Sequence, residues 1–294
     1  MEEQEKTYPK NNRLSGSILI GAALIAGAVL MKDKETSATL PQREATENAA
    51  DSASNIAPTL VLPWGDLGGK LVSVGALDRE AFLSLYSGTP REKARRLIDT
   101  SESVTVTKQN AGIILNLLWG LGLAQKSPVL EKGMMMEKRF GGADKFASTA
   151  GFTIARGDPM EHYSHHLFMS LSPESEELVA RVASNIYRPC CDNATHFPDC
   201  NHGMAMLGLL ELLISQGSSE QELYDAALVM NRLWFPEQYV VIDRYMRSKG
   251  EKNPDAKTLL SKSLVSASGF AKVSRDAETP SEERESGGGG GCSV

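Results

Sequence analysis

The chain has 294 residues, of which 41% are hydrophobic and 23% are charged, and its formal net charge is −6. This length and composition allow one buried core of ordinary size, or two small ones, and exclude a chain with too few apolar residues to fold. The acidic balance provides no basic surface to attract phosphate backbones, so we expect no nucleic-acid partner.

The first predicted element is an uncharged apolar run over residues 14–31, bounded by Arg13 and Lys32. A helix of this length is just long enough to cross a bilayer. A cleaved signal peptide is the alternative, but no small-x-small cleavage site closes the run. We therefore expect an N-terminal flank over residues 1–13 and an uncleaved single transmembrane anchor over residues 14–31. Basic residues on both sides leave its orientation open.

Two further segments are predicted to lack stable structure. Residues 32–58 are rich in Ala, Thr, Ser, Glu and Asn, and so few large apolar side chains cannot offset the entropy lost on ordering. We expect this segment to be a flexible tether. Residues 251–294 are similar and end in five glycines and Cys292-Ser293-Val294, which predicts a disordered tail with one thiol near its tip.

Residues 60–250 are predicted to form an α-helical domain. Thr89 and Asp158 each precede a proline and lie three residues before a glutamate, and Ser172 and Ser218 mark two further helix starts. The runs 110–124 and 204–214 are apolar nearly all round and too short to cross a membrane, which is typical of central core helices.

Residues 222–234 and 236–249 alternate apolar and charged side chains at helical period, and only Val104-Thr105-Val106 favours a strand. The expected fold class is therefore all-α: a single transmembrane helix followed by a helical bundle domain with an irregular Cys/His loop.

All five histidines and three of the four cysteines lie between His162 and His202. Imidazole and thiolate groups bind borderline and soft metal ions and carry out thiol chemistry. The first part of this window is the helix expected after Asp158, where His162 and His166 have i,i+4 spacing and share one face, with Glu161 nearby. This spacing suits a helical metal site, whereas a polar helix face is the simpler alternative.

The second part is an irregular loop that follows Pro189 and precedes the apolar helix near Gly203. Its three thiols and the imidazole of His202 make up the ligand set of a closed tetrahedral zinc site. The predicted ligands are Cys190, Cys191, Cys200 and His202, with Asp199 or His196 as substitutes and His162 as the contribution of the neighbouring helix. The expected cofactor is a transition-metal ion, with zinc as the first choice and copper as the second.

The same cysteines allow other chemistry. In an oxidising compartment Cys191 and Cys200 could close a ten-residue disulfide loop, leaving Cys190 free or paired with Cys292. An odd thiol beside a disulfide is also the arrangement of a thiol–disulfide exchange protein. Cys200 and His202 could form a nucleophilic pair, so whether the protein is an enzyme stays open.

The run Tyr187–Gly217, YRPCCDNATHFPDCNHGMAMLGLLELLISQG, resembles the core of a family of uncharacterised, membrane-anchored bacterial proteins found especially in candidate-phylum genomes. Residues 160–166 and 233–236 are similar to that family as well, and the resemblance covers about residues 105–245. It implies a membrane anchor followed by an extracytoplasmic domain, and His162 is more typical of the family than His165 or His166. It implies no established activity.

The sequence therefore predicts a single-pass protein of the cell membrane with an extracytoplasmic metal-binding domain, serving in metal handling. The alternatives are a thiol–disulfide redox protein and an interaction module stabilised by a disulfide. The membrane is the expected partner, through the N-terminal helix, and the sequence names no protein partner. Cys292 on its glycine-rich segment would reach the site and exchange metal or electrons there.

Overall fold

The computed structural model describes residues 60–278. The predicted flank, anchor and tether over residues 1–58 lie outside the described residues, as does Cys292. Among the residues that are described, no helix is both long enough and apolar enough to cross a membrane.

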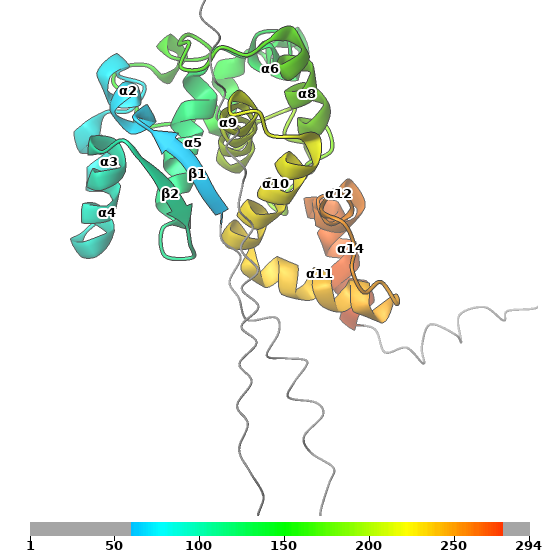
Figure 1. Ribbon diagram of the computed structural model, residues 1–294. Coiled ribbons are helices and arrows are strands. Elements are labelled where there is room, and N and C mark those ends of the chain that lie inside the picture. Colours follow the sequence, from blue (N-terminus) through cyan, green and yellow to red (C-terminus); the bar gives the residue numbers. More distant parts are fainter. Residues whose placement is uncertain (1–59, 279–294) are drawn as a thin grey trace, which may run out of the picture. The chain divides into compact units, whose positions relative to one another are not determined.

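Residues 60–278 fold mostly into helices, with one small sheet (Figure 1). The strands are β1 (Leu60–Gly65) and β2 (Glu102–Val106). The longer helices are α2 (Leu67–Val74), α4 (Gly88–Asp99), α5 (Ala111–Ala124), α8 (Pro173–Ala183), α9 (Asn201–Ser215), α10 (Glu220–Trp234), α11 (Pro236–Ser248) and α14 (Ala267–Glu278). The shorter ones are α3 (Arg79–Ser84), α6 (Pro128–Glu131), α7 (Ala147–Ala150), α12 (Ala256–Leu259), α13 (Lys262–Val265) and the 3₁₀ helices η2 (Met134–Met136), η3 (Lys138–Phe140), η4 (Ala143–Lys145) and η5 (Pro159–Glu161).

The two strands form an antiparallel pair that the all-α prediction missed. Leu60 lies opposite Val106, and a register shift separates Leu62 from Gly65. Burial alternates along β1, with Leu60, Leu62 and Trp64 facing the core. The brief β-branched run 104–106 belongs to β2. Its partner strand was not predicted because Pro63 and Gly65 disfavour a strand in the sequence.

The centre of the fold is the pair α5 and α9, the two apolar helices predicted from the sequence. Their backbones approach closely at Gly122 and Gly208, where a Cβ on Gly208 would lie 2.6 Å from the carbonyl oxygen of Leu118. A Cβ on Gly122 would overlap the carbonyl oxygen of Met204. This contact fixes where α9 begins, and with it the position of the cysteine loop.

Other helix starts agree with the local signals to within a residue or two. The Ser172 hydroxyl caps α8 by accepting a hydrogen bond from the Ser175 amide. The capping box of α10 uses Ser219 and Glu222, one residue beyond the predicted Ser218. Tertiary packing shifts such boundaries easily, because neighbouring serines cap equally well.

The predicted disordered tail is wrong over residues 256–278, which form α12, α13 and α14. Leu259, Val265 and Val273 of this segment are buried against Tyr239 and Ile242 of α11, forming a second apolar cluster. The few apolar residues of this segment are insufficient to form a core by themselves. They are buried because α11 contributes the remaining apolar side chains of the cluster. Residues 279–294 of the predicted tail lie outside the described residues.

Candidate metal centre

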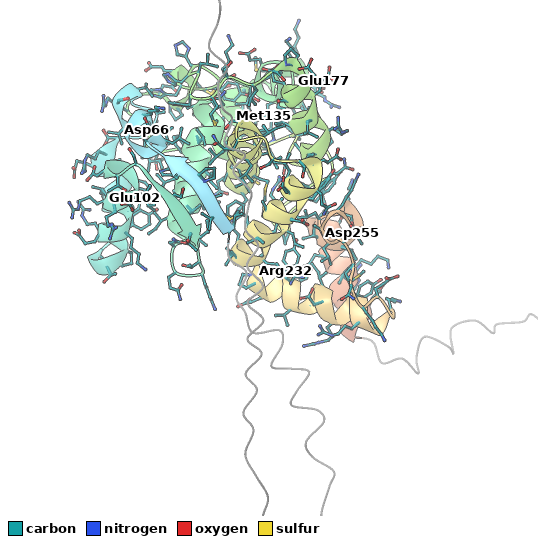
Figure 2. All side chains as sticks on the ribbon, in the orientation of Figure 1. Asp66, Glu102, Met135, Glu177, Arg232 and Asp255 are labelled. Carbon is teal, nitrogen blue, oxygen red and sulfur yellow. The ribbon has the colours of Figure 1, made fainter. Side chains whose placement is uncertain are left out.

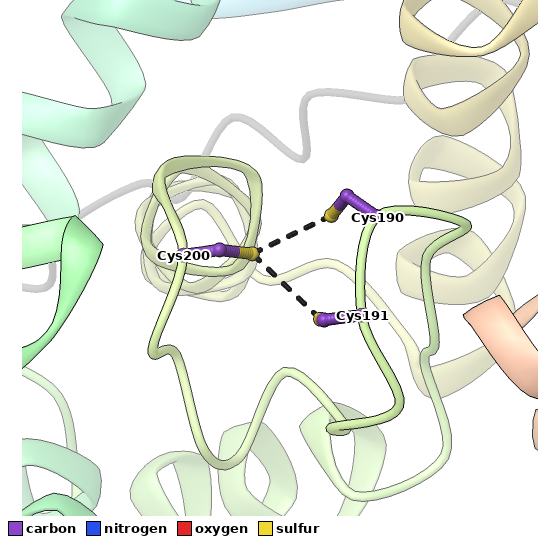
Figure 3. Close-up of side chains that lie close together, drawn as sticks. All are labelled: Cys190, Cys191 and Cys200. Carbon is purple, nitrogen blue, oxygen red and sulfur yellow. Dashed lines mark hydrogen bonds between the residues drawn. The ribbon is translucent and has the colours of Figure 1, made fainter.

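The cysteine loop connects α8 to α9 and brings three thiols together (Figure 3). Cys190 and Cys191 lie on one arm of the loop, and Cys200 lies at its end as the N-cap residue of α9. The Sγ atom of Cys200 accepts a hydrogen bond from the Gly203 amide at 3.4 Å. The amide groups at the start of a helix favour negative charge, so this end of α9 stabilises a thiolate.

The distances between the sulfur atoms fit a metal site. Sγ of Cys200 lies 3.6 Å from Sγ of Cys190 and 3.8 Å from Sγ of Cys191, and all three atoms lie within 4.8 Å of one another. A tetrahedral zinc ion with Zn–S bonds of about 2.3 Å requires S···S separations of about 3.8 Å. A disulfide needs a sulfur separation of about 2.05 Å, and all three cysteines are free thiols. The three cysteines can therefore hold a metal ion.

Arg188 lies beside the thiols, and its side chain has no solvent exposure. Its Nη2 donates to Sγ of Cys191 at 3.2 Å, and its Nη1 donates to the hydroxyl of Thr195 at 2.9 Å. The guanidinium stays charged at any physiological pH, and a buried charge needs an opposite one nearby. The only carboxylate that the described residues pair with it belongs to Asp199, at 3.9 Å. The three sulfur atoms, and Cys200 before the others, are therefore placed to supply the counter-charge of Arg188.

The same contacts shift the pKa values of the thiols in opposite directions. Hydrogen bonds from Cys190 and Cys191 lower the pKa of Cys200 well below its ordinary value, and the charge of Arg188 and the Gly203 amide act in the same direction. The pKa of Cys190 is raised, because its thiol shares hydrogen bonds with Cys191 and Cys200 and is partly desolvated. Cys200 is therefore the first of the three to become a thiolate.

Asp199, a predicted substitute ligand, supports the loop instead of joining the thiols. One carboxylate oxygen, Oδ2, accepts a hydrogen bond from the side chain of Asn193 at 2.7 Å. The other, Oδ1, is buried with no hydrogen-bond partner among the described residues. Burial raises the pKa of Asp199. Asp199 lies next to Arg188 and does not belong to the ligand group. Residues in such positions commonly orient the groups that surround a metal site.

The two histidines of the loop do not join the ligand group. The ring of His202 packs against the rings of Trp234 and Phe235, at centroid distances of 5.7 and 4.6 Å. Burial lowers the pKa of both His202 and His196. Among residues 60–278, the three thiols are the only set of three or more His, Cys, Asp or Glu side chains close enough to share one ion.

The helix predicted to carry His162 and His166 is wrong. Asp158 does cap a helical turn, through its bond to the Met160 amide, but only the 3₁₀ helix η5 follows. The chain then bends at Ser164, and His166 pairs with Gln125 in an isolated bridge. These contacts with the end of α5 override the local helix signal. The imidazoles nevertheless meet, with Nδ1 of His162 3.0 Å from Nε2 of His166, as a pair separate from the three thiols.

Arg188 is the residue of this site that the sequence did not single out. It stands two positions before Cys190, but an arginine in a loop ordinarily reaches solvent, and only its complete burial identifies it as part of the site.

No family model matches the chain, and no significant match is found among curated proteins or solved structures.

Proposed function

We propose that this protein binds a transition-metal ion through the thiolates of Cys190, Cys191 and Cys200, in a domain tethered to a membrane on its extracytoplasmic side. The observation that carries the proposal is the gathering of three sulfur atoms within 4.8 Å of one another, with the two separations from Cys200 close to the edge length of a tetrahedral thiolate site. The membrane tether and its sidedness rest on the apolar run over residues 14–31 and on the sequence resemblance.

Charge balance supports zinc as the first choice. Three thiolates and a divalent ion carry one net negative charge, which the buried cation of Arg188 neutralises. Copper(I), the second choice, would leave two negative charges against the one arginine. A site with less uncompensated charge costs less to desolvate.

A three-cysteine site with one exposed thiol supports a role in metal handling. Cys190 is exposed, and among the described residues no fourth side chain joins the group. Closed structural zinc sites have four protein ligands, whereas a site with three leaves one coordination position for an incoming ligand. An ion held in this way is accessible to exchange with a partner.

The test is metal content and thiol accessibility in the full-length protein, purified in mild detergent without added metal and then reconstituted with one equivalent of zinc. We expect one ion per chain and protection of three thiols from a thiol reagent until a chelator is added. Cys200→Ser should lose the ion, and the control Ser248→Ala, at an exposed position of α11, should keep it. Failure to retain zinc, and also copper(I) after a parallel reconstitution with one equivalent of that ion, would contradict the proposal.

A thiol–disulfide function is the second candidate, favoured by the lowered pKa of Cys200 beside an exposed thiol. The thiolate of Cys200 would attack a disulfide oxidant, forming a mixed disulfide and releasing one thiol. The thiolate of Cys190 or Cys191 would then displace the second thiol and form a disulfide within the loop. In the same experiment this function predicts no bound metal and two thiols that appear only after a reductant is added.

A further inference from the structure

Glu211 is a buried carboxyl group that the metal site does not use. It lies on α9, three turns beyond the cysteine loop, and its side chain is 1% exposed. Its Oε2 atom has no hydrogen-bond partner among the described residues, and burial raises its pKa to about 8. The side chain of Ser127 bonds to this carboxyl group, but the Oε2 atom is left without a partner within residues 60–278. A buried oxygen without a partner costs stability, so its presence in an apolar helix points to a ligand that pairs with it.

Glu211 lines the inner end of a recess between α6, α8 and α9. These three helices are labelled in Figure 1. The inner end has a volume of about 10 Å³, with Ser127, Val129 and Val179 around it. An outer part of about 100 Å³ continues from it and shares Glu176 and Leu171 with it.

The walls of the recess are held in place by buried polar contacts. Gln125 is 1% exposed, and its Oε1 accepts hydrogen bonds from the amides of Phe168 and Met169 at 3.0 and 3.1 Å. The hydroxyl of Ser164 accepts a bond from the Ser127 amide at 2.9 Å. Ser164 has a φ of 51°, the only positive φ of a non-glycine residue within residues 60–278. Such strained residues gather at ligand sites, where surrounding contacts hold them.

The lining indicates the chemistry of the ligand. Glu131 and Glu176 face one lysine, Lys126, so the recess favours a positive charge. Glu211 adds a third negative charge once a bound cation lowers its raised pKa and it releases its proton. A volume of about 10 Å³ holds a group the size of one water molecule, which is also the size of a primary ammonium group. A metal ion fits less well, because the three carboxylates do not come close enough together to share one.

We propose that this recess binds a small organic cation whose primary ammonium group enters the inner end and donates a hydrogen bond to Oε2 of Glu211. A short alkyl chain of the ligand occupies the outer part, against the apolar side chains of Pro128, Leu167 and Leu171. Leu167 is 67% exposed, and a ligand seated there covers it. Binding pockets commonly combine such an apolar wall with a few polar groups that fix orientation.

Isothermal titration of the full-length protein at constant ionic strength tests the proposal, with n-butylammonium as the probe. We expect saturable binding at one site per chain. n-Butyltrimethylammonium, whose head group is too large for the inner end, and neutral n-butanol should each bind at least tenfold more weakly. Equal binding of the two cations, or no binding of n-butylammonium, would overturn the proposal.

A matched pair of variants locates the site. Glu211→Gln keeps the shape of the side chain and removes its ability to become negative, so n-butylammonium should bind at least tenfold more weakly. Glu177→Gln changes an exposed glutamate of α8 and should leave binding unchanged (Figure 2). Unchanged binding in folded Glu211→Gln contradicts the proposal, and the head-group comparison on the unaltered protein decides the matter if that variant does not fold.

Discussion

The guanidinium of Arg188 donates a hydrogen bond to the sulfur of Cys191 at 3.2 Å while being completely buried. A permanent cation is thereby fixed next to the three thiols shown in Figure 3. Its charge favours thiolates over thiols, and thiolates are the form that binds metal.

Replacing this cation with a lysine tests its contribution to metal binding. Arg188→Lys keeps the positive charge but removes the planar guanidinium group, whose two terminal nitrogens donate to Cys191 and Thr195 at the same time. Because outer partners orient metal ligands, we expect zinc affinity to fall about 10–100-fold, measured by competition with a chromophoric chelator. Arg181→Lys, at an exposed pair with Glu220, is the control and should leave affinity unchanged. An unaltered affinity in Arg188→Lys would show that a positive charge is sufficient and that the two guanidinium hydrogen bonds do not contribute to zinc binding.

The C-terminal helix α14 is attached directly to the cysteine loop. The carboxylate of Asp192 accepts hydrogen bonds from the amide and the hydroxyl of Ser268 at 2.8 and 2.7 Å, and the Cys191 carbonyl accepts one from the Ala267 amide at 3.0 Å. We expect Asp192→Ala to speed amide hydrogen exchange across residues 267–278, as measured by mass spectrometry. Asp225→Ala, whose carboxylate accepts a hydrogen bond only from Gln221 of its own helix α10 among the bonds of the described residues, should not change exchange there.

The hydrogen bonds between Asp192 and Ser268 also predict how the stability of α14 changes with pH. Hydrogen bonds from the amide and hydroxyl of Ser268 lower the pKa of Asp192 below 3.8. The contribution of this carboxylate to stability is therefore complete above pH 3.8 and is lost as the pH falls through the lower pKa of the folded state. Exchange in α14 should rise at acid pH in the unaltered protein and respond less in Asp192→Ala.

Glu211 makes the opposite contribution to the pH dependence of stability. Its pKa rises from 4.5 to about 8 on burial, so between these values the folded state holds a proton that the unfolded state has lost. The free energy of unfolding therefore decreases as the pH rises through this window, by up to about 5 kcal/mol. In Glu211→Gln this decrease should be absent from denaturant unfolding curves measured at pH 5, 6.5 and 8. A variant that retains the full pH dependence would contradict the assignment.

The contact between α5 and α9 predicts very different effects for two glycine substitutions. In Gly208→Ala the new Cβ would lie 2.6 Å from the Leu118 carbonyl oxygen, so the helices must move apart, at a cost of about 3 kcal/mol or more. In Gly112→Ala the Cβ meets nothing within 4 Å, and stability should rise by about 1 kcal/mol because alanine favours a helix. Thermal unfolding of both variants measures the difference, and similar melting temperatures would contradict the tight crossing.

The sequence predicted most of the central helices correctly because their signals are local. The apolar runs of α5 and α9 and the serine cap of α8 depend on residues within a few positions of one another. The same local rules failed after Asp158, where the backbone pairing of His166 with α5 ends the helix after one turn. They also failed for α12 to α14, whose apolar residues are buried by α11.

By itself, the sequence determined that a helical domain carries a thiol-rich loop before an apolar helix, because residue type and short-range spacing are sufficient for both conclusions. Only the tertiary structure decided which of the candidate ligands meet. It brought Cys200 to Cys190 and Cys191, turned His202 toward Trp234 and buried Arg188 beneath the loop. These outcomes depend on how α9 packs against α5 and α10, and such contacts between distant segments leave no periodic signal in the sequence.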